Sequence, residues 1–168
     1  EVEIFPLSFA EYLSYNGIFR EMPSLVDAPR VRGKLRKAFA DYMVCGGFPD
    51  VQGLDTTTRI MLLQGYVDAV VYRDILERHE VGSVQSLKYV LQYLLQNFGR
   101  KVSVRAMANV LKQLSLPHDR EMLGDYLAYY ADAYFAYPVS LRTDSLAVRR
   151  TNPDKDYLVD KGMIGALQ

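Results

Sequence analysis

Few residues of this sequence have the types and spacing that catalysis requires. A loop that binds a nucleoside triphosphate needs converging glycine N–H groups, followed by a lysine and a serine or threonine hydroxyl. The segment at Gly33 and Lys34 lacks both the upstream glycine and the hydroxyl. We therefore predict that this chain alone holds no cofactor and does not hydrolyse ATP.

Metal and nucleophile chemistry have no local signature either. The two histidines, His79 and His118, and the single cysteine, Cys45, show no spacing typical of a zinc or iron site. A lone cysteine is commonly a small buried hydrophobic residue, so we expect Cys45 to be structural. Arg73 and Glu77 are spaced for an i,i+4 ion pair on a solvated helix face. We predict no catalytic residue and no metal site in this chain.

Basic residues gather at two places where they could contact phosphate or carboxylate groups. The first is a run without acids: Arg30, Arg32, Lys34, Arg36 and Lys37. Such a run is most often a solvated helix end. The second is the loop of a predicted β-hairpin, which supplies four candidate nucleic-acid contacts: Arg142, Arg149, Arg150 and Lys155. Asp144, Asp154 and Asp156 are interspersed with these cations, so the charge of the hairpin is mixed.

Helical periodicity with capping signals covers the first 133 residues. Ser8 and Glu11 form a capping box for a short helix that ends at Asn16-Gly17. Glu21 to Pro29 predicts a connector, and Gly46-Gly47-Phe48-Pro49-Asp50 predicts a break between helices. Further helices are predicted at residues 31–44, from 55 or 56 to about 80, 83–99, 103–114 and 118–133. Ser83 and Ser103 are the predicted N-caps of the helices that they begin.

The pattern changes after residue 133. Residues 134–141 are rich in aromatic and branched side chains and predict a strand interrupted at Pro138, and residues 156–160 predict its partner. Helices followed by a β-hairpin are the order of a winged helix-turn-helix. We predict a mainly α fold, with a helical lid-like region at 1–82 that includes an N-terminal strand remnant, and a winged-helix domain at 83–168.

The candidate recognition helix, residues 118–132, weighs against the usual contact of this fold with DNA. It carries one basic residue, Arg120, against four acids: Asp119, Glu121, Asp125 and Asp132. Like charge repels the phosphate backbone. A winged helix that packs against protein therefore fits at least as well as one that contacts DNA.

Composition places the chain among ordinary globular proteins. Of its 168 residues, 49% are hydrophobic and 24% are charged, which argues against disorder or a disulfide scaffold. Twenty basic residues balance twenty acidic ones, so no bulk charge attracts nucleic acid or an anionic membrane. The apolar runs are too short to cross a bilayer, and we expect a cytoplasmic protein without membrane contact. The absence of an initiator methionine predicts a piece of a longer chain.

Four segments, taken in order, resemble a known family. They are residues 3–13, Gly46-Gly47-Phe48-Pro49, Tyr72-Arg73-Asp74-Ile75 with Arg78-His79, and Tyr157-Leu158-Val159-Asp160-Lys161-Gly162. This order is similar to prokaryotic AAA-type ATPases that carry a C-terminal domain of unknown function of the DUF4143 type. The resemblance covers nearly the whole chain.

The resemblance implies several functional features. It implies a full-length parent that binds ATP and Mg²⁺ through an upstream P-loop core, with a nuclease-like region downstream, both of them partners of this chain. It also implies that Gly47, Phe48 and Pro49 line an adenine pocket, although a turn between two helices explains the same residues. Arg73 would then act as a lid arginine that reaches a phosphate, whereas a plain ion pair with Glu77 is the alternative.

Two functions follow as hypotheses. The first is a non-catalytic lid and winged-helix fragment of an AAA-type ATPase, which couples nucleotide state to a protein or DNA partner. The alternative is a stand-alone winged-helix regulator that binds DNA. The second hypothesis predicts salt-sensitive duplex binding that weakens when Arg149 and Arg150 are replaced.

Overall fold

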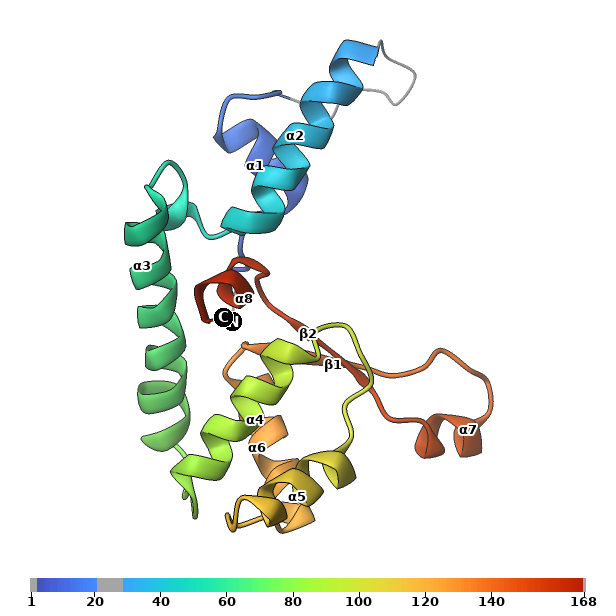
Figure 1. The fold of residues 1–168 in the computed structure, drawn as a ribbon. Coiled ribbons are helices and arrows are strands. Elements are labelled where there is room, and N and C mark those ends of the chain that lie inside the picture. Colours follow the sequence, from blue (N-terminus) through green and yellow to red (C-terminus); the bar gives the residue numbers. More distant parts are fainter. Residues whose placement is uncertain (1–2, 21–28, 168) are drawn as a thin grey trace. The chain divides into compact units, whose positions relative to one another are not determined.

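The computed structural model describes residues 3–20 and 29–167, without the side chains of Leu146, Arg149 and Arg150 (Figure 1). The chain divides into two compact units. Unit 1 comprises Glu1–Tyr66 and Asp160–Gln168, and unit 2 comprises Val67–Val159. This division differs from the predicted boundary between residues 82 and 83 in two ways: the chain enters unit 2 after Tyr66, and the C-terminal segment returns to unit 1, where α8 packs on α2.

Unit 1 begins with an extended segment and two packed helices, α1 (Phe9–Tyr15) and α2 (Pro29–Cys45). The predicted capping box is confirmed, since Ser8 and Glu11 exchange both of its hydrogen bonds. The interface between the helices is built on three buried side chains: Tyr12, Leu13 and Ala38. The predicted connector, Glu21 to Pro29, lies outside the described residues except for Pro29, which begins α2. The predicted strand remnant lies partly outside them, and residues 3–7 have no regular secondary structure.

The rest of unit 1 is a short 3₁₀ helix, η1 (Pro49–Val51), most of α3 (Thr56–Ala69) and the C-terminal α8 (Gly162–Leu167). Asp55 caps α3, because its carboxylate accepts hydrogen bonds from the N–H groups of Thr57 and Thr58. Helix α8 packs on α2, and the Gln64 side chain donates to the Ala166 carbonyl at 2.8 Å. The sequence did not predict α8, which has only six residues.

Unit 2 begins with the last residues of α3, which continues as a π-helix, η2 (Val70–Leu76), where a continuous α-helix to residue 80 was predicted. The Glu77 N–H donates to the Tyr72 carbonyl, five residues earlier, at 3.2 Å. This wider turn ends the helix early. Val71 and Ile75 are nevertheless buried, as their helical spacing predicted.

Three helices form the body of unit 2: α4 (Val84–Gln96), α5 (Val104–Gln113) and α6 (Arg120–Asp132). Ser83 and Ser103 cap α4 and α5 as predicted, and Asp119 caps α6. The core between these helices holds large buried side chains: Leu87, Leu94, Met107, Leu111, Leu123, Tyr126, Tyr130 and Phe135. The Tyr130 hydroxyl donates to the Leu87 carbonyl at 3.0 Å, which satisfies its buried polar atom.

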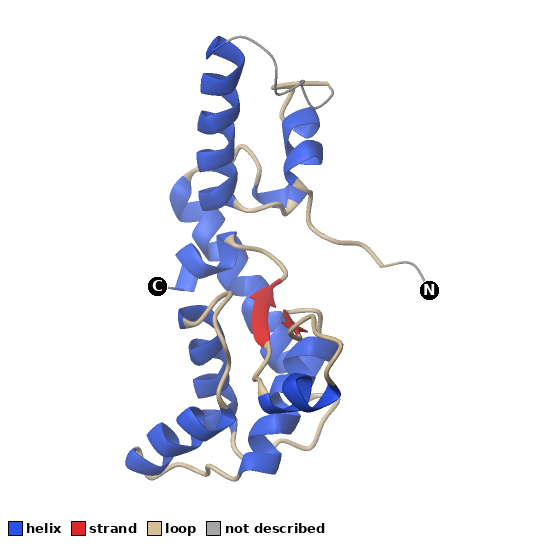
Figure 2. Ribbon diagram, turned by 90° about the vertical axis from the view of Figure 1, so that its right-hand side faces the viewer, coloured by secondary structure: helices blue, strands red, loops and turns tan. Residues whose placement is uncertain are grey.

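A small antiparallel sheet follows, with β1 (Ala136–Val139) paired to β2 (Lys155–Leu158) (Figure 2). The other edge of β2 meets residues 99–102, because Gly99 N–H donates to the Asp156 carbonyl and Val102 N–H to the Asp154 carbonyl. Pro138 is tolerated within β1 because this strand lies at an edge. Both strands are shorter than predicted, and the loop between them contains an unpredicted helix, α7 (Leu146–Thr151).

The order of unit 2 is thus helix, extended segment, two helices and a two-stranded wing, which consists of β1, β2 and the loop between them (residues 136–158). The predicted mainly α fold with a small β-hairpin is confirmed. In the described part of the chain, no helix combines the length and the apolar character needed to cross a membrane.

Candidate functional site

Strand β2 presents opposite chemistry on its two faces, because successive side chains of a strand alternate. Lys155 and Tyr157 are exposed, whereas Asp156 and Leu158 are buried. On β2, the cation Lys155 therefore lies on the outer face and the carboxylate of Asp156 on the inner face. Two hollows of unit 2 lie on these two faces.

The outer face carries a hollow of about 240 Å³ that is rich in cations. Its lining includes Lys101, Arg142 and Lys155, and none of the described residues that line it is acidic. Lys101 and Lys155 face each other across a β-bridge. The Lys101 ammonium donates to the Asn152 side-chain oxygen at 3.2 Å, which orients one of the three cations.

Aromatic and apolar side chains complete the outer hollow. Tyr157 is 38% exposed, and its ring meets the Phe98 ring edge-on at 5.8 Å. Val139 and Leu141 also line the hollow and are exposed. Cations interleaved with an aromatic ring are typical of surfaces that contact nucleic acid.

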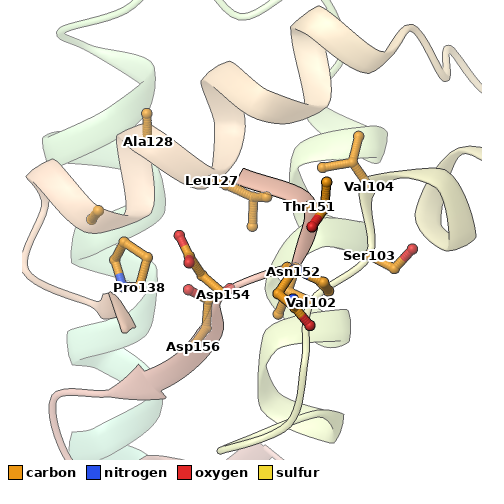
Figure 3. Close-up of a pocket in the computed structure, with 12 residues that line it drawn as sticks. Val102, Ser103, Val104, Leu127, Ala128, Pro138, Thr151, Asn152, Asp154 and Asp156 are labelled. Carbon is orange, nitrogen blue, oxygen red and sulfur yellow. The ribbon is translucent and has the colours of Figure 1, made fainter. Parts of the chain in front are cut away.

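The inner face of the sheet borders a larger cavity of about 620 Å³ (Figure 3). Its walls come from the segment before α5, from α6, from Pro138 and from the end of the wing. The lining is mainly apolar, with two carboxylates: Val102, Ser103, Val104, Leu127, Ala128, Ala131, Pro138, Thr151, Asn152, Pro153, Asp154 and Asp156. Burial, and next the charge of Asp154, raise the pKa of Asp156 to about 6.

A third, shallow hollow of about 680 Å³ lies at the turn between α5 and α6. Lys112, His118 and Arg120 line it together with Asp119. Along α6 itself, three of the acids noted in the sequence, Glu121, Asp125 and Asp132, are exposed. This helix therefore presents an acidic surface, which does not favour insertion into a DNA groove.

Of the four predicted nucleic-acid contacts, Arg142 and Lys155 lie together in the outer hollow. Arg149 and Arg150 belong to α7, and their side chains lie outside the described residues. Sequence reasoning missed Lys101, which is 41 residues before Arg142 in the chain. Its position could be found only from the pairing of residues 99–102 with β2.

The predicted nucleotide-contacting residues are distributed over both units. Gly47 and Phe48 precede η1, which begins at Pro49 in unit 1, and the Phe48 ring packs on the Tyr66 ring at 5.1 Å. Arg73 belongs to unit 2. The turn thus has a structural role, which the sequence left open.

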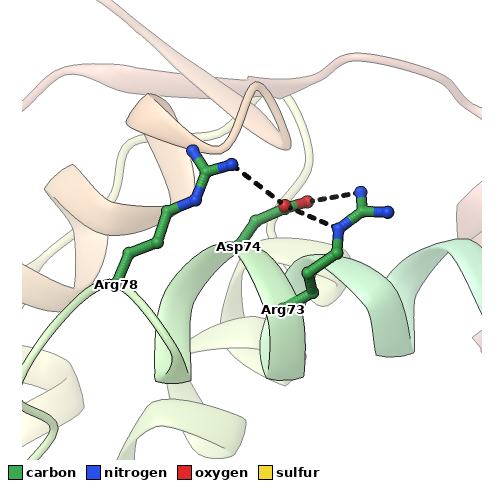
Figure 4. A network of polar contacts seen from close by, with 3 residues as sticks. All are labelled: Arg73, Asp74 and Arg78. Carbon is green, nitrogen blue, oxygen red and sulfur yellow. Dashed lines mark hydrogen bonds and ion pairs between the residues drawn. The ribbon is translucent and has the colours of Figure 1, made fainter.

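Arg73 pairs with Asp74 and not with Glu77 as predicted (Figure 4). The Arg73 Nε–Asp74 Oδ1 distance is 3.0 Å, and Arg78 lies 3.8 Å from the same oxygen. Arg73 thus forms its ion pair with the adjacent residue, while Asp74 and Arg78 form an i,i+4 pair. Asp74 and the nearby Glu77 raise the pKa of Arg73, which stays charged and solvated.

Asp160 connects two of the sequence motifs within unit 1. It is 5% exposed, and its carboxylate accepts hydrogen bonds from the N–H groups of Gly47 at 2.5 Å and Gly162 at 2.7 Å. Burial raises the pKa of Asp160, while the two N–H donors act in the opposite direction. The carboxylate is fully used in holding the fold together, so it is a structural group.

Cys45 and His79 make contacts within the fold. Cys45 is half-buried, and its sulfur accepts a hydrogen bond from the Arg59 guanidinium at 3.3 Å. The His79 ring stacks on Tyr129 at 3.9 Å. Across the residues that the structure describes, no group of three His, Cys, Asp or Glu side chains could hold a metal ion.

Comparisons with known proteins give a family without a known role. A family model described as "Domain of unknown function (DUF8612)" matches residues 36–168. "Uncharacterized protein MJ1544" of Methanocaldococcus jannaschii is 28% identical over 95% of this chain, and an "Uncharacterized protein" of Haemophilus influenzae is 29% identical over 97% of it. The chain spans only 35% and 38% of the length of these relatives. No solved structure matches the chain.

These findings correct the resemblance drawn from the four sequence segments. The matching model is not that of an AAA-type ATPase or a DUF4143 domain, and both relatives are described only as uncharacterised. The assignment to AAA-type ATPases is therefore wrong. Several expectations depended on that resemblance alone and are no longer supported. They are the binding of ATP and Mg²⁺, the ATPase core, the nuclease-like region, and the adenine-pocket and lid-arginine roles.

Proposed function

The chain belongs to the DUF8612 family of unknown function, and we propose that its unit 2 binds the phosphate backbone of duplex DNA through the outer face of the wing. The observation that carries this proposal is the gathering of Lys101, Arg142 and Lys155 around one hollow. No described lining residue opposes them with negative charge.

The chemistry of the hollow suits a polyanion rather than a single small anion. Its three cations come from three separate segments, namely the extended stretch before α5, the wing loop and β2. Each DNA phosphate that a cation neutralises releases condensed counterions, which drives association at low salt. Three contacts predict a salt slope of about −3 for log K against log[salt].

The wing is favoured over α6 as the contact surface. The exposed side of α6 carries Glu121, Asp125 and Asp132, which repel phosphates. In contrast, Asp154 and Asp156 of the wing line the inner cavity, and the exposed Asp144 of the wing loop does not line the outer hollow. Backbone contacts of this kind position a protein on DNA but do not read its sequence. We therefore expect binding with little sequence preference.

The test is fluorescence anisotropy with a labelled 20-base-pair duplex at several salt concentrations. A triple variant, Lys101→Ala with Arg142→Ala and Lys155→Ala, should bind at least about tenfold more weakly at low salt and lose most of the salt slope. A matched control, Arg73→Ala with Arg78→Ala and Lys88→Ala, removes the same charge from exposed positions elsewhere in unit 2. It should retain both affinity and slope.

Three results would overturn the proposal. One is the absence of duplex binding by the unmodified chain at low salt. Another is an equal loss of duplex affinity in the triple variant and its control, which would mean that only the net charge of the chain matters. The third is a selective loss in a Lys112→Ala, Arg120→Ala variant, which would assign the contact to the hollow between α5 and α6.

A further inference from the structure

The inner cavity of unit 2 has the composition of a ligand site, and it is independent of the DNA contact proposed above. We propose that this cavity binds an organic cation: an ammonium or guanidinium group carried on a short apolar chain. Asp156 and Asp154 would hold the charged group, and the walls from α6 and the segment before α5 would cover the apolar chain.

The first observation is a buried carboxylate without a partner. Asp156 is only 8% exposed, yet none of the described residues donates a hydrogen bond or forms an ion pair with its side chain. Figure 3 shows the side chains of Asp154 and Asp156 close together on the wing side of the cavity, with Leu127 contributed by α6. Asp160, the other buried acid of the described chain, accepts two backbone hydrogen bonds. The described part of the chain thus supplies hydrogen-bond donors to the carboxylate of Asp160 but none to that of Asp156.

The second observation is the electrostatic cost of this arrangement. A buried carboxylate beside a second carboxylate is disfavoured in its charged form, and this is the reason that the pKa of Asp156 is raised. A cation placed between the two would offset both burial and mutual repulsion. The site therefore gains most from a ligand that carries positive charge.

The third observation is the size and character of the walls. A volume of about 620 Å³ lies within the range typical of small-molecule sites. The apolar part of the lining is formed by Val102, Val104, Leu127, Ala128, Ala131 and Pro138. A bare metal ion would leave this surface unused, and hard cations prefer six or more oxygen ligands. An amphiphilic cation matches both the charged end and the apolar walls.

The experiment is isothermal titration of the whole chain with n-butylguanidinium at pH 7.5, in phosphate buffer so that no ammonium buffer competes. The neutral isostere n-butylurea tests the role of charge and should bind at least about tenfold more weakly. Blocked arginine, with both its termini capped, tests the source of the ligand. Tighter binding of blocked arginine identifies an arginine side chain of a peptide, and tighter binding of n-butylguanidinium or n-butylammonium identifies a free small cation.

Variants then assign the binding to this cavity. Asp156→Asn keeps the size of the side chain and should weaken n-butylguanidinium at least about tenfold. Ala131→Leu adds bulk to the lining, leaves both carboxylates in place and should also weaken binding. Asp144→Asn removes an exposed charge of the same wing that does not line the cavity, so its affinity should equal that of the unmodified chain. Circular dichroism of each variant verifies that it is folded.

Several outcomes contradict the proposal. They are no detectable binding of any cation by the unmodified chain at about 10 mM, equal affinity for n-butylurea, or no effect of Asp156→Asn and Ala131→Leu in folded variants. Binding that emerges only when Arg149 and Arg150 are both replaced by alanine would also contradict it. That result would mean that an arginine of the chain itself competes for the carboxylates.

Discussion

The carboxylate of Asp160 accepts a hydrogen bond from the backbone N–H of Gly47, a residue 113 positions earlier in the chain. The Gly47 carbonyl in turn accepts a hydrogen bond from Leu7 N–H at 2.7 Å, and the Leu7 carbonyl accepts one from the Tyr42 hydroxyl at 2.8 Å. Three distant segments of unit 1 therefore meet at one buried point. Gly47 and Gly162 are required here because other backbone atoms approach them too closely for a Cβ. The stability of unit 1 should depend on this set of hydrogen bonds.

Replacement of Asp160 tests this point directly. Asp160→Ala leaves the buried N–H groups of Gly47 and Gly162 without acceptors, and we expect a loss of about 2–4 kcal/mol in the free energy of unfolding. Urea denaturation followed by circular dichroism measures this loss. Asp144→Ala, which removes an exposed carboxylate, should change the value by less than about 0.5 kcal/mol. Equal losses of unfolding free energy in the two variants would mean that the hydrogen bonds of Asp160 do not stabilise unit 1.

Gly46 and Gly53 form a matched pair for a second prediction. Both have positive φ angles, +81° and +75°, which cost any other residue about 1 kcal/mol. A Cβ at Gly46 would also collide with the Asp160 carboxylate, whereas a Cβ at Gly53 meets open space. Gly46→Ala should therefore destabilise the chain by at least about 2 kcal/mol more than Gly53→Ala in the same urea assay. Equal losses would show that backbone conformation alone selects glycine at both positions.

The raised pKa of Asp156 makes a prediction for pH dependence. Between its ordinary pKa near 4 and its folded value of about 6, the folded state binds more protons than the unfolded state. By linkage, this group's contribution to stability then falls as pH rises through that window, and the full penalty remains above pH 6. Asp156→Asn should thus be the more stable protein by about 1–2 kcal/mol at pH 7.5, after allowance for solvent in the cavity.

Thermal or urea unfolding of both proteins from pH 3.5 to pH 7.5 measures this difference. The advantage of the variant should shrink toward zero below pH 4, where the carboxyl of Asp156 is neutral in both states. Asp154 is the other titratable residue among the described lining of the cavity, so Asp154→Asn should narrow the window by lowering the pKa of Asp156. A difference between the proteins that does not vary with pH would contradict the prediction.

The acidic surface of α6 allows the DNA proposal to be tested from the opposite side. If the duplex contacts the wing, the double variant Glu121→Gln with Asp125→Asn should change duplex affinity less than about threefold and leave the salt slope unaltered, since these acids face solvent on another element. Anisotropy titration at two salt concentrations gives both quantities. A tenfold gain in duplex affinity with a steeper salt slope would instead indicate that DNA contacts α6, which would contradict binding by the wing.

Much of the local structure follows from the sequence because its causes are local. Ser8 with Glu11, Ser83 and Ser103 are caps whose hydrogen bonds close within three residues, and all of them are observed. The apolar spacing of α4 and α5 likewise predicted their buried faces. In contrast, α7 and α8 have six residues each, too few for a periodic signal, and neither was predicted. The π-helical turn at Val70 was missed because it preserves apolar spacing while changing the hydrogen-bond pattern.

The sequence alone therefore determined the helical character of the chain, the positions of most caps, the wing at its C-terminal end and the acidic surface of α6. Tertiary structure decided which residues meet. Lys101 joins Arg142 and Lys155 only because residues 99–102 pair with β2. Asp154 and Asp156 are separated from those cations only because a paired strand directs alternate side chains to opposite faces. Caps and periodicity act over a few residues, whereas a cavity or a buried carboxylate depends on segments that are distant in the sequence.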